Sequence, residues 1–449
     1  MKHNTASILC DVFCIAMLSI FLFGFRRDGY LSIAETKLWI FVVLALLFLF
    51  SLSVTALWQR KKQINRKEDA KPLSSAQWLI LFYLLWTLIS AFASPWRSEA
   101  LLGGSRCEGA LVISLYALTA LMLSRFSHPK AVLLHVSAGS VLFYCLICFL
   151  QFFDLNPFGL YPRGLFWSGR NIVYNGSFIG FSGNADISAS ILCLFFPLFT
   201  VYAIRKRRYI FLLPALCCFA VIVFSQVSGS LLGALGGLLL SLPFMTRGTP
   251  LQRRRRTRML LCFLILVLAV IYVIPFSGLL GEAHSVLHGN FDDRFGSGRI
   301  FIWRNTLPLL RERLLLGGGA DCFSHRMTAV FSRVTEDGTT ITRGIDCAHC
   351  EYLNILVNQG LPALVSLLAA MLLTFKNAIK TDSDASVMFA SAMLCYGIQA
   401  AFGISMPANT AYFWILWGIN ASLPNVQAAP HSSDVQIAQS EFPSDCPKI

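Results

Sequence analysis

The residues with the clearest chemical potential are arginines in two long polar segments, residues 153–184 and 278–350. Together these segments contain ten arginines and no lysine, whereas the shorter polar segments contain both. Arginine keeps its charge in any environment and presents a planar fork of N–H donors that matches phosphate and carboxylate. The bias favours a site for a phosphorylated or acidic ligand. The alternative is that these arginines only reach toward lipid headgroups.

A histidine stands at the end of the second segment. His349 has Asp346 and Glu351 as close neighbours in the sequence. The ordinary pKa of histidine suits it to proton transfer near neutral pH. The two acidic residues would orient His349 or favour its charged form. Alternatively, they are acidic residues at the start of a helix, where the helix dipole favours negative charge.

The same segment offers a rival chemistry in its cysteines. Cys322 and His325 form one pair at zinc-like spacing, and Cys347 and Cys350 form another. Outside the cytoplasm, a disulfide between Cys322 and either Cys347 or Cys350 competes with zinc, and so do free thiols. We expect no metal here and leave the state of the thiols open.

Composition identifies the kind of protein that holds these residues. The chain has 449 residues, of which 56% are apolar and 13% charged, with a formal charge of +14. Such a chain is too apolar and aromatic to be disordered. It is too long and too poor in cysteine for a disulfide scaffold. A nucleic-acid binder would match the charge but not the hydropathy, so we expect no nucleic-acid partner. The remaining class is a membrane protein with many spans.

The spans follow from the length of the apolar stretches, since about 20 apolar residues cross a bilayer as a helix. The stretches that qualify lie near 7–25, 37–58, 76–94, 109–126, 131–152, 185–204, 209–226, 229–246, 259–277, 352–375, 386–404 and 409–423. With the N-terminus in the cytoplasm, every short cluster of four or more basic residues falls inside. We therefore expect an all-α polytopic membrane protein of about twelve helices, with both arginine-rich segments outside.

This topology divides the chain into four parts. They are spans one to nine (1–277), an extracytoplasmic loop (278–350), spans ten to twelve (351–423) and a disordered cytoplasmic tail (424–449). Within the loop, Trp303, Leu307, Leu310 and Leu314 recur at helical spacing. They predict an amphipathic helix over residues 300–316 that lies along the membrane face.

Three motifs in and after this loop occur in a fixed order. They read GSGRIFIW at 296–303, LLGGGADCF at 315–323 and HCEYLNILVNQGLP at 349–362. Two shorter elements, GSRCEG at 104–109 and GNAD at 183–186, precede them. In order, spacing and expected placement, these motifs resemble those of the O-antigen ligase and O-antigen polymerase superfamily.

The resemblance implies a helical GT-C-like bundle in the cytoplasmic (inner) membrane of a bacterium. It implies transfer of a glycan from a polyprenyl diphosphate carrier to a glycolipid or glycan acceptor on the extracytoplasmic side. The reaction would invert the sugar carbon and need neither metal nor cofactor; membrane lipid would be a further partner. Arg299 matches the family's diphosphate-binding arginine and His349 its catalytic histidine. We assign substrate binding to Arg106, Arg163, Arg170, Asp346 and Trp303.

The sequence departs from the family pattern in three places. Cys350 stands for the usual Asn after the histidine, and Asp186 stands for another Asn. The stretch Ser225–Ser230 lacks the arginine that opens a span in the family. Arg163 and Arg170 are the candidate substitutes. If neither reaches the site, the chain would be a catalytically inactive relative.

A second function class is a transporter or flippase for polyprenyl-linked glycans. Transporters tend to carry ionisable residues at mid-membrane and to show paired halves. Here the predicted spans are nearly free of charge and the polar residues gather outside, which favours the enzyme. The sequence does not separate ligation from polymerisation.

Overall fold

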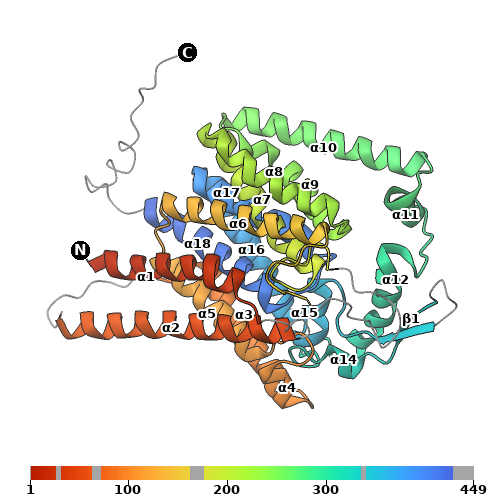
Figure 1. Ribbon diagram of the computed structural model, residues 1–449, viewed down its shortest axis with the longest axis horizontal. Helices are drawn as coiled ribbons and strands as arrows, with labels where there is room; N and C mark the ends of the chain where they lie inside the picture. The colour runs from red at the N-terminus through yellow and green to blue at the C-terminus, as the bar shows by residue number, and fades with distance from the viewer. Residues whose placement is uncertain (1, 27–31, 63–71, 162–175, 335–339, 428–449) are drawn as a thin grey trace.

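The computed structural model describes residues 2–26, 32–62, 72–161, 176–334 and 340–427, and it is mainly helical (Figure 1). A helix coincides with each predicted span. These helices are α1 (Lys2–Ala16) with a π-helical turn (Met17–Phe21), α2 (Ile33–Lys62), α3 (Ser75–Phe92), α5 (Ala110–Phe126), α6 (Ala131–Phe152), α7 (Ala185–Lys206), α8 (Leu212–Phe224), α9 (Ser228–Met245), α10 (Pro250–Val273), α15 (Glu351–Gln359) with α16 (Leu361–Thr381), α17 (Asp384–Ala400) and α18 (Pro407–Gln427). Among the described residues, seven helices are long and apolar enough to cross a membrane, and three shorter helices are apolar. The all-α polytopic class is confirmed, and the count of twelve spans stays a prediction.

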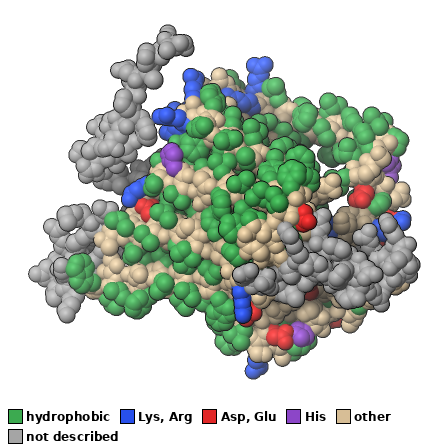
Figure 2. Space-filling model, in the orientation of Figure 1, with side chains coloured by type: hydrophobic (Ala, Val, Ile, Leu, Met, Phe, Trp, Pro, Cys, Tyr) green, Lys and Arg blue, Asp and Glu red, His purple; other side chains and the backbone are tan. Residues whose placement is uncertain are grey.

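The bundle is built around α7, whose most apolar window is 83% buried. This helix packs against α17, α8 and α9, while α18 packs against α5 and α16 against α3. At its start, the Asn184 side chain accepts a hydrogen bond from the Asp186 N–H and so caps the helix. In contrast, no residue of the most apolar window of α10 is buried within the chain. Figure 2 shows hydrophobic side chains over much of the visible face, as lipid contact requires.

The predicted tenth span is interrupted at Gly360, between α15 and α16. Gly360 has a φ of +89°, a conformation that favours glycine. A side chain there would also collide with the carbonyl of Leu315. The glycine-rich turn at 317–319 packs against the end of α15, where the N–H groups of Gly318 and Gly319 donate to the carbonyls of Val357 and Asn358.

Residues 278–334 and 340–350 form a cap of short elements. They are α11 (Gly278–Leu287), α12 (Phe295–Thr306), a 3-10 turn (Leu307–Leu309), α13 (Leu310–Arg313), α14 (Phe323–Arg326), β1 (Val330–Val334) and β2 (Thr340–Gly344). The strands pair antiparallel, with Val330 opposite Gly344, and this hairpin was not predicted. The single amphipathic helix predicted over 300–316 is wrong in its extent. Pro308 lies in the 3-10 turn that separates α12 from α13, because proline has no N–H for the helix.

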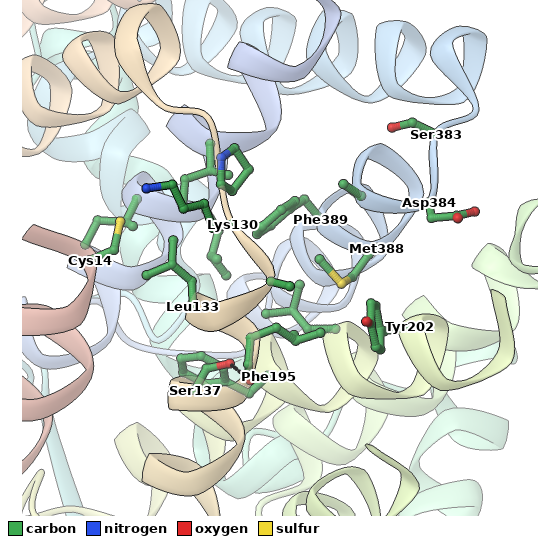
Figure 3. Close-up of a pocket in the computed structure, with 18 of the residues that line it drawn as sticks. Cys14, Lys130, Leu133, Ser137, Phe195, Tyr202, Ser383, Asp384, Met388 and Phe389 are labelled. Atoms are coloured by element: carbon green, nitrogen blue, oxygen red, sulfur yellow. Dashed lines mark hydrogen bonds between the residues drawn. The ribbon is translucent and has the colours of Figure 1, made fainter. Parts of the chain in front are cut away.

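A cavity of about 930 Å³ lies toward the opposite end of the bundle, between α1, α6, α7, α17 and α18 (Figure 3). Lys206, at the end of α7, lines it, whereas Asp186 begins the same helix beside the cap. Twenty residues of helix separate these two positions, which is about 30 Å. We call these ends the cap end and the cavity end. Of the predicted tail, residues 424–427 continue α18, and 428–449 lie outside the described residues.

Candidate active site

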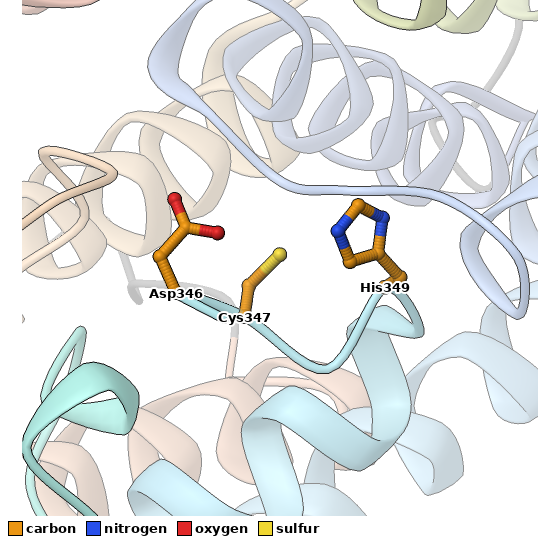
Figure 4. Close-up of side chains that lie close together, drawn as sticks. All are labelled: Asp346, Cys347 and His349. Carbon is orange, nitrogen blue, oxygen red and sulfur yellow. The ribbon is translucent and has the colours of Figure 1, made fainter. Parts of the chain in front are cut away.

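The candidate site is centred on the loop between β2 and α15. Asp346, Cys347 and His349 direct ligand atoms toward one another, all within 4.8 Å (Figure 4). His349 has a φ of +47°, so the chain turns sharply there before Cys350 begins α15. This turn places the imidazole on the same side of the loop as the Asp346 carboxylate.

Arg106 reaches this loop from the turn between α4 (Arg97–Leu102) and α5. Its Nη2 donates to Asp346 Oδ1 at 2.7 Å and to Cys347 Sγ at 3.5 Å. The predicted substrate-binding residues Arg106 and Asp346 are thus an ion pair beside His349. Burial acts to lower the pKa of Arg106, but Cys347, Asp346 and Asp321 together raise it above its ordinary value, so the guanidinium stays charged.

Asp321 positions the turn that carries Arg106, and the sequence did not single it out. Its carboxylate accepts hydrogen bonds from the backbone N–H groups of Gly104 at 2.7 Å, Arg106 at 3.0 Å and Glu108 at 3.2 Å. Asp321 belongs to the second motif, LLGGGADCF, so this motif and the GSRCEG element are joined in space. The presence of both motifs in the sequence was the only signal that could have pointed to Asp321.

Arg299 enters the site from α12, directly after a glycine-rich turn. Gly296, Ser297 and Gly298 all have positive φ values, which bends the chain before the arginine. Arg299 Nη1 donates to the Gly296 carbonyl at 2.6 Å, and Nε and Nη2 donate to the Phe402 carbonyl at 3.1 and 2.8 Å. Within the described part of the chain, all of its hydrogen-bond acceptors are backbone carbonyls. These dipoles fix the guanidinium without neutralising its charge.

Trp303 supports the site from behind. Its indole Nε1 donates to the Ala348 carbonyl at 3.0 Å, directly before His349. Its ring also lies 6.2 Å from that of Phe402, whose carbonyl receives Arg299. These contacts suit a positioning residue, and the predicted role of Trp303 in substrate binding stays a prediction.

The electrostatic surroundings keep His349 uncharged. Burial, together with the nearby positive charges of Arg106 and Arg299, lowers the pKa of His349 to about 4 against the opposing effect of Asp346. A neutral imidazole at pH 7 has a free lone pair that can accept a proton. Both arginines therefore lie close enough to His349 to affect its titration.

Two carboxyl groups lie beneath the site, around a cavity of about 40 Å³ that Arg106 also lines. Glu351 accepts a hydrogen bond from Tyr396 Oη at 3.1 Å, and Glu108 accepts one from Tyr116 Oη at 3.3 Å. Burial raises the pKa of Glu108 to about 7. Glu351 therefore faces the bundle and Tyr396, and the structure gives it a different partner from the predicted His349.

The two cysteine pairs predicted at zinc-like spacing have different surroundings in the structure. Cys322, Cys347 and Cys350 are free thiols. His325 pairs with Glu99 and stacks on Trp96 at 4.9 Å between ring centroids. Asp346, Cys347 and His349 could ligate a metal ion. However, Arg106 donates to the first two of these, so a cation would have to displace the guanidinium. The expectation of no metal stays an expectation.

The stretch that lacks the family arginine lies close to Arg299. A side chain at Gly229 would contact Phe402, the residue whose carbonyl binds Arg299. Asp186 lies within electrostatic reach of both Arg299 and Arg106. The candidate substitutes Arg163 and Arg170 lie outside the described residues.

Comparison with known proteins agrees with this assembly. Residues 213–368 match the family described as O-antigen ligase. The matched region runs from α8 into α16 and includes Arg299, Asp321, Asp346 and His349. No curated protein matches the chain. The match covers residues 213–368 alone, and it supports the predicted resemblance to the O-antigen ligase and polymerase superfamily.

Proposed function

We propose that this protein transfers a glycan from a polyprenyl diphosphate carrier to a hydroxyl group of a glycolipid or glycan acceptor. The reaction would take place at the outer face of the cytoplasmic membrane of a bacterium. The observation that carries the proposal is the convergence of Arg299 and Arg106, from distant parts of the chain, beside a neutral His349. A pair of guanidinium groups matches a diphosphate, and a neutral imidazole matches a hydroxyl proton.

Arg299 is the group best suited to the leaving diphosphate. As the bond between the sugar and the diphosphate breaks, negative charge accumulates on the phosphate oxygens. A donor that is already fixed in place stabilises such charge without reorganising during the reaction. Arg299 is fixed by the Gly296 and Phe402 carbonyls, which are neutral acceptors and form no ion pair with it.

Arg106 would supply the second guanidinium. Its Nη2 is held by Asp346, whose side chain is 39% exposed, so the pair borders accessible space. Asp321 fixes the backbone of Arg106 independently of that pair. The arginine therefore keeps its position when a phosphate oxygen approaches and competes with Asp346.

His349 would act on the acceptor. The acceptor oxygen attacks the anomeric carbon of the donor glycan, the bond from that carbon to the diphosphate oxygen breaks, and the diphosphate leaves with the bonding electrons. The hydroxyl proton passes to the lone pair of His349. Attack opposite the leaving group inverts the anomeric carbon. The competing assignment is that His349 binds the diphosphate. In that case His349→Ala would lose donor binding, whereas the assignment made here predicts that loss for Arg299→Gln.

The test uses the full-length protein in liposomes with a lipid-diphosphate-linked glycan and candidate acceptors. We expect His349→Ala, Arg299→Gln and Arg106→Gln to lose transfer. The matched control is Arg311→Gln, which removes an exposed arginine from the same segment, on α13. Unchanged transfer in the three site variants would contradict the mechanism. Absence of transfer by the wild type with every acceptor, together with movement of the donor across the bilayer, would favour a flippase instead.

A further inference from the structure

The cavity at the cavity end has no part in the proposed chemistry: its rim at Lys206 lies about 30 Å along α7 from Asp186 at the cap end. Its volume of about 930 Å³ is at the upper end of the range of small-molecule sites. Apolar side chains line its interior, including Met17, Leu133, Phe195, Met388 and Phe389 (Figure 3). Such an interior suits a hydrocarbon chain better than water.

The rim of the cavity carries a surplus of positive charge. Asp384 forms ion pairs with Arg205 at 2.8 Å, Lys206 at 3.0 Å and Arg247 at 2.9 Å. Asp382 pairs with Arg205 at 3.0 Å and with Arg253. Four cations thus share two carboxylates, and Arg208 also lines the cavity, so basic groups outnumber the carboxylates at this rim.

The cations of the rim differ in accessibility. The Arg205 side chain is 1% exposed, and it also donates to the Phe244 carbonyl. The side chains of Lys206 and Arg247 are 49% and 71% exposed, and both line the cavity. Arg205 therefore holds the rim together, while Lys206 and Arg247 face a ligand. Across the opening, Lys130 pairs with Asp11 at 3.0 Å, which adds no net charge.

We propose that this cavity binds an anionic phospholipid, with an acyl chain in the apolar interior and the phosphate at Lys206 and Arg247. The apolar interior excludes a free phosphate as the full ligand, and the net positive rim disfavours a headgroup that brings its own cation. The basic loops predict that this end faces the cytoplasm, where the leaflet is rich in anionic lipid. The proposal does not depend on glycan transfer.

The test measures retained lipid by native mass spectrometry on the purified full-length protein. The protein is exchanged into a mild detergent with equal amounts of phosphatidylglycerol and phosphatidylcholine. We expect the wild type to retain phosphatidylglycerol preferentially. A basic residue near an anionic headgroup contributes about fivefold in affinity, so Lys206→Gln with Arg247→Gln should lose about 25-fold. The matched control is Arg254→Gln with Arg255→Gln, which removes the same charge from exposed positions on α10 that do not line the cavity.

A second variant leaves the rim untouched. Ser137 lines the interior from α6, so Ser137→Phe should narrow the path of an acyl chain and reduce retention of both lipids while all rim charges remain. A thermal melt identifies any variant that fails to fold. Three results would overturn the proposal: equal retention of both lipids by the wild type, equal loss in the rim and control variants, or retention of added polyprenyl phosphate in place of phosphatidylglycerol.

Discussion

Arg299 and Arg205 are both largely withdrawn from solvent, at opposite ends of the same bundle, and they are held in different ways. Arg205 forms ion pairs with Asp382 and Asp384, so carboxylates neutralise its charge. Arg299 donates to the carbonyls of Gly296 and Phe402, which orient it; among the described residues no carboxylate forms a direct ion pair with it, and Asp186 lies only within electrostatic reach. A buried cation that is neutralised by its own protein serves the fold. A partly buried cation that is oriented by dipoles and has no direct ion pair is prepared for an anion from outside.

Arg106 lies between these two cases. It pairs with the partly exposed Asp346, while Asp321 holds its backbone. Its position therefore does not depend on the ion pair. The comparison predicts that variants at the cavity end affect folding first, and that variants at the cap end affect transfer first.

The largest expected effect is on stability, at Arg205. Arg205→Gln leaves Asp382 and Asp384 short of a buried partner, and breaking such a pair costs about 3–5 kcal/mol. Thermal unfolding of the purified protein should show a large decrease in the transition temperature. The control is Lys206→Gln, because Lys206 also pairs with Asp384 but is far more exposed than Arg205; it should lower the transition temperature much less. An unchanged transition temperature in Arg205→Gln would contradict the claim that Arg205 stabilises the fold.

The next effect is on the reaction, at Arg299. Arg299→Gln keeps a donor near Phe402 but removes the charge, and loss of one fixed donor at a developing anion costs about 10²–10³ in kcat. Its unfolding transition should stay close to that of the wild type. Arg299→Lys should restore little, because one ammonium cannot reproduce the fork held by two carbonyls. Recovery of full activity with lysine would show that only the charge matters.

A smaller effect is expected at Asp321, where a carboxylate holds backbone and not a cation. In Asp321→Asn the remaining oxygen can still accept at the Oδ2 position, but the amide NH2 replaces Oδ1 and faces the Arg106 N–H, which now lies 3.2 Å from that atom; we expect a cost of about 1–3 kcal/mol. We expect an increase in the KM for the lipid donor through displacement of Arg106. A change in kcat alone would argue that Asp321 acts on the chemistry and not on Arg106.

The finest prediction concerns the pH dependence of transfer. The folded pKa of His349 is lowered to about 4, so the neutral imidazole should persist, and transfer should hold, as the pH falls from 7 to about 5. Arg106→Gln removes a positive neighbour, which raises the pKa of His349, and its residual activity should decline at a higher pH than that of the wild type. Activity profiles from pH 4 to 8 measure this, with Arg311→Gln as the unshifted control. A wild-type decline centred near 6.5 would mean that His349 is not held neutral.

The sequence predicted the helical class and the main site residues for clear physical reasons. Apolar stretches long enough to cross a bilayer can be recognised directly in the sequence, and each coincides with a helix. Arg299 and His349 stand inside motifs with fixed spacing, so their resemblance could be read directly. Arg106 and Asp346 were singled out separately, and only the fold shows that they form an ion pair.

What the sequence missed depends on contacts between distant segments. The carboxylate of Asp321 supports a turn more than two hundred positions earlier. Glu108 and Glu351 become a buried pair only when α5 and α15 pack together, so Glu351 looked like an ordinary helix-start residue. The 3-10 turn at Leu307–Leu309 and the β1–β2 hairpin are local features that apolar periodicity does not report.

The most direct test of the central claim is equilibrium binding of a polyprenyl diphosphate to the purified protein. The account predicts that Arg299→Gln loses most of the affinity for this donor, whereas His349→Ala binds it like the wild type and fails to transfer the glycan. Equal affinity of Arg299→Gln and wild type, or loss of donor binding in His349→Ala alone, would contradict the account and assign the diphosphate to the histidine.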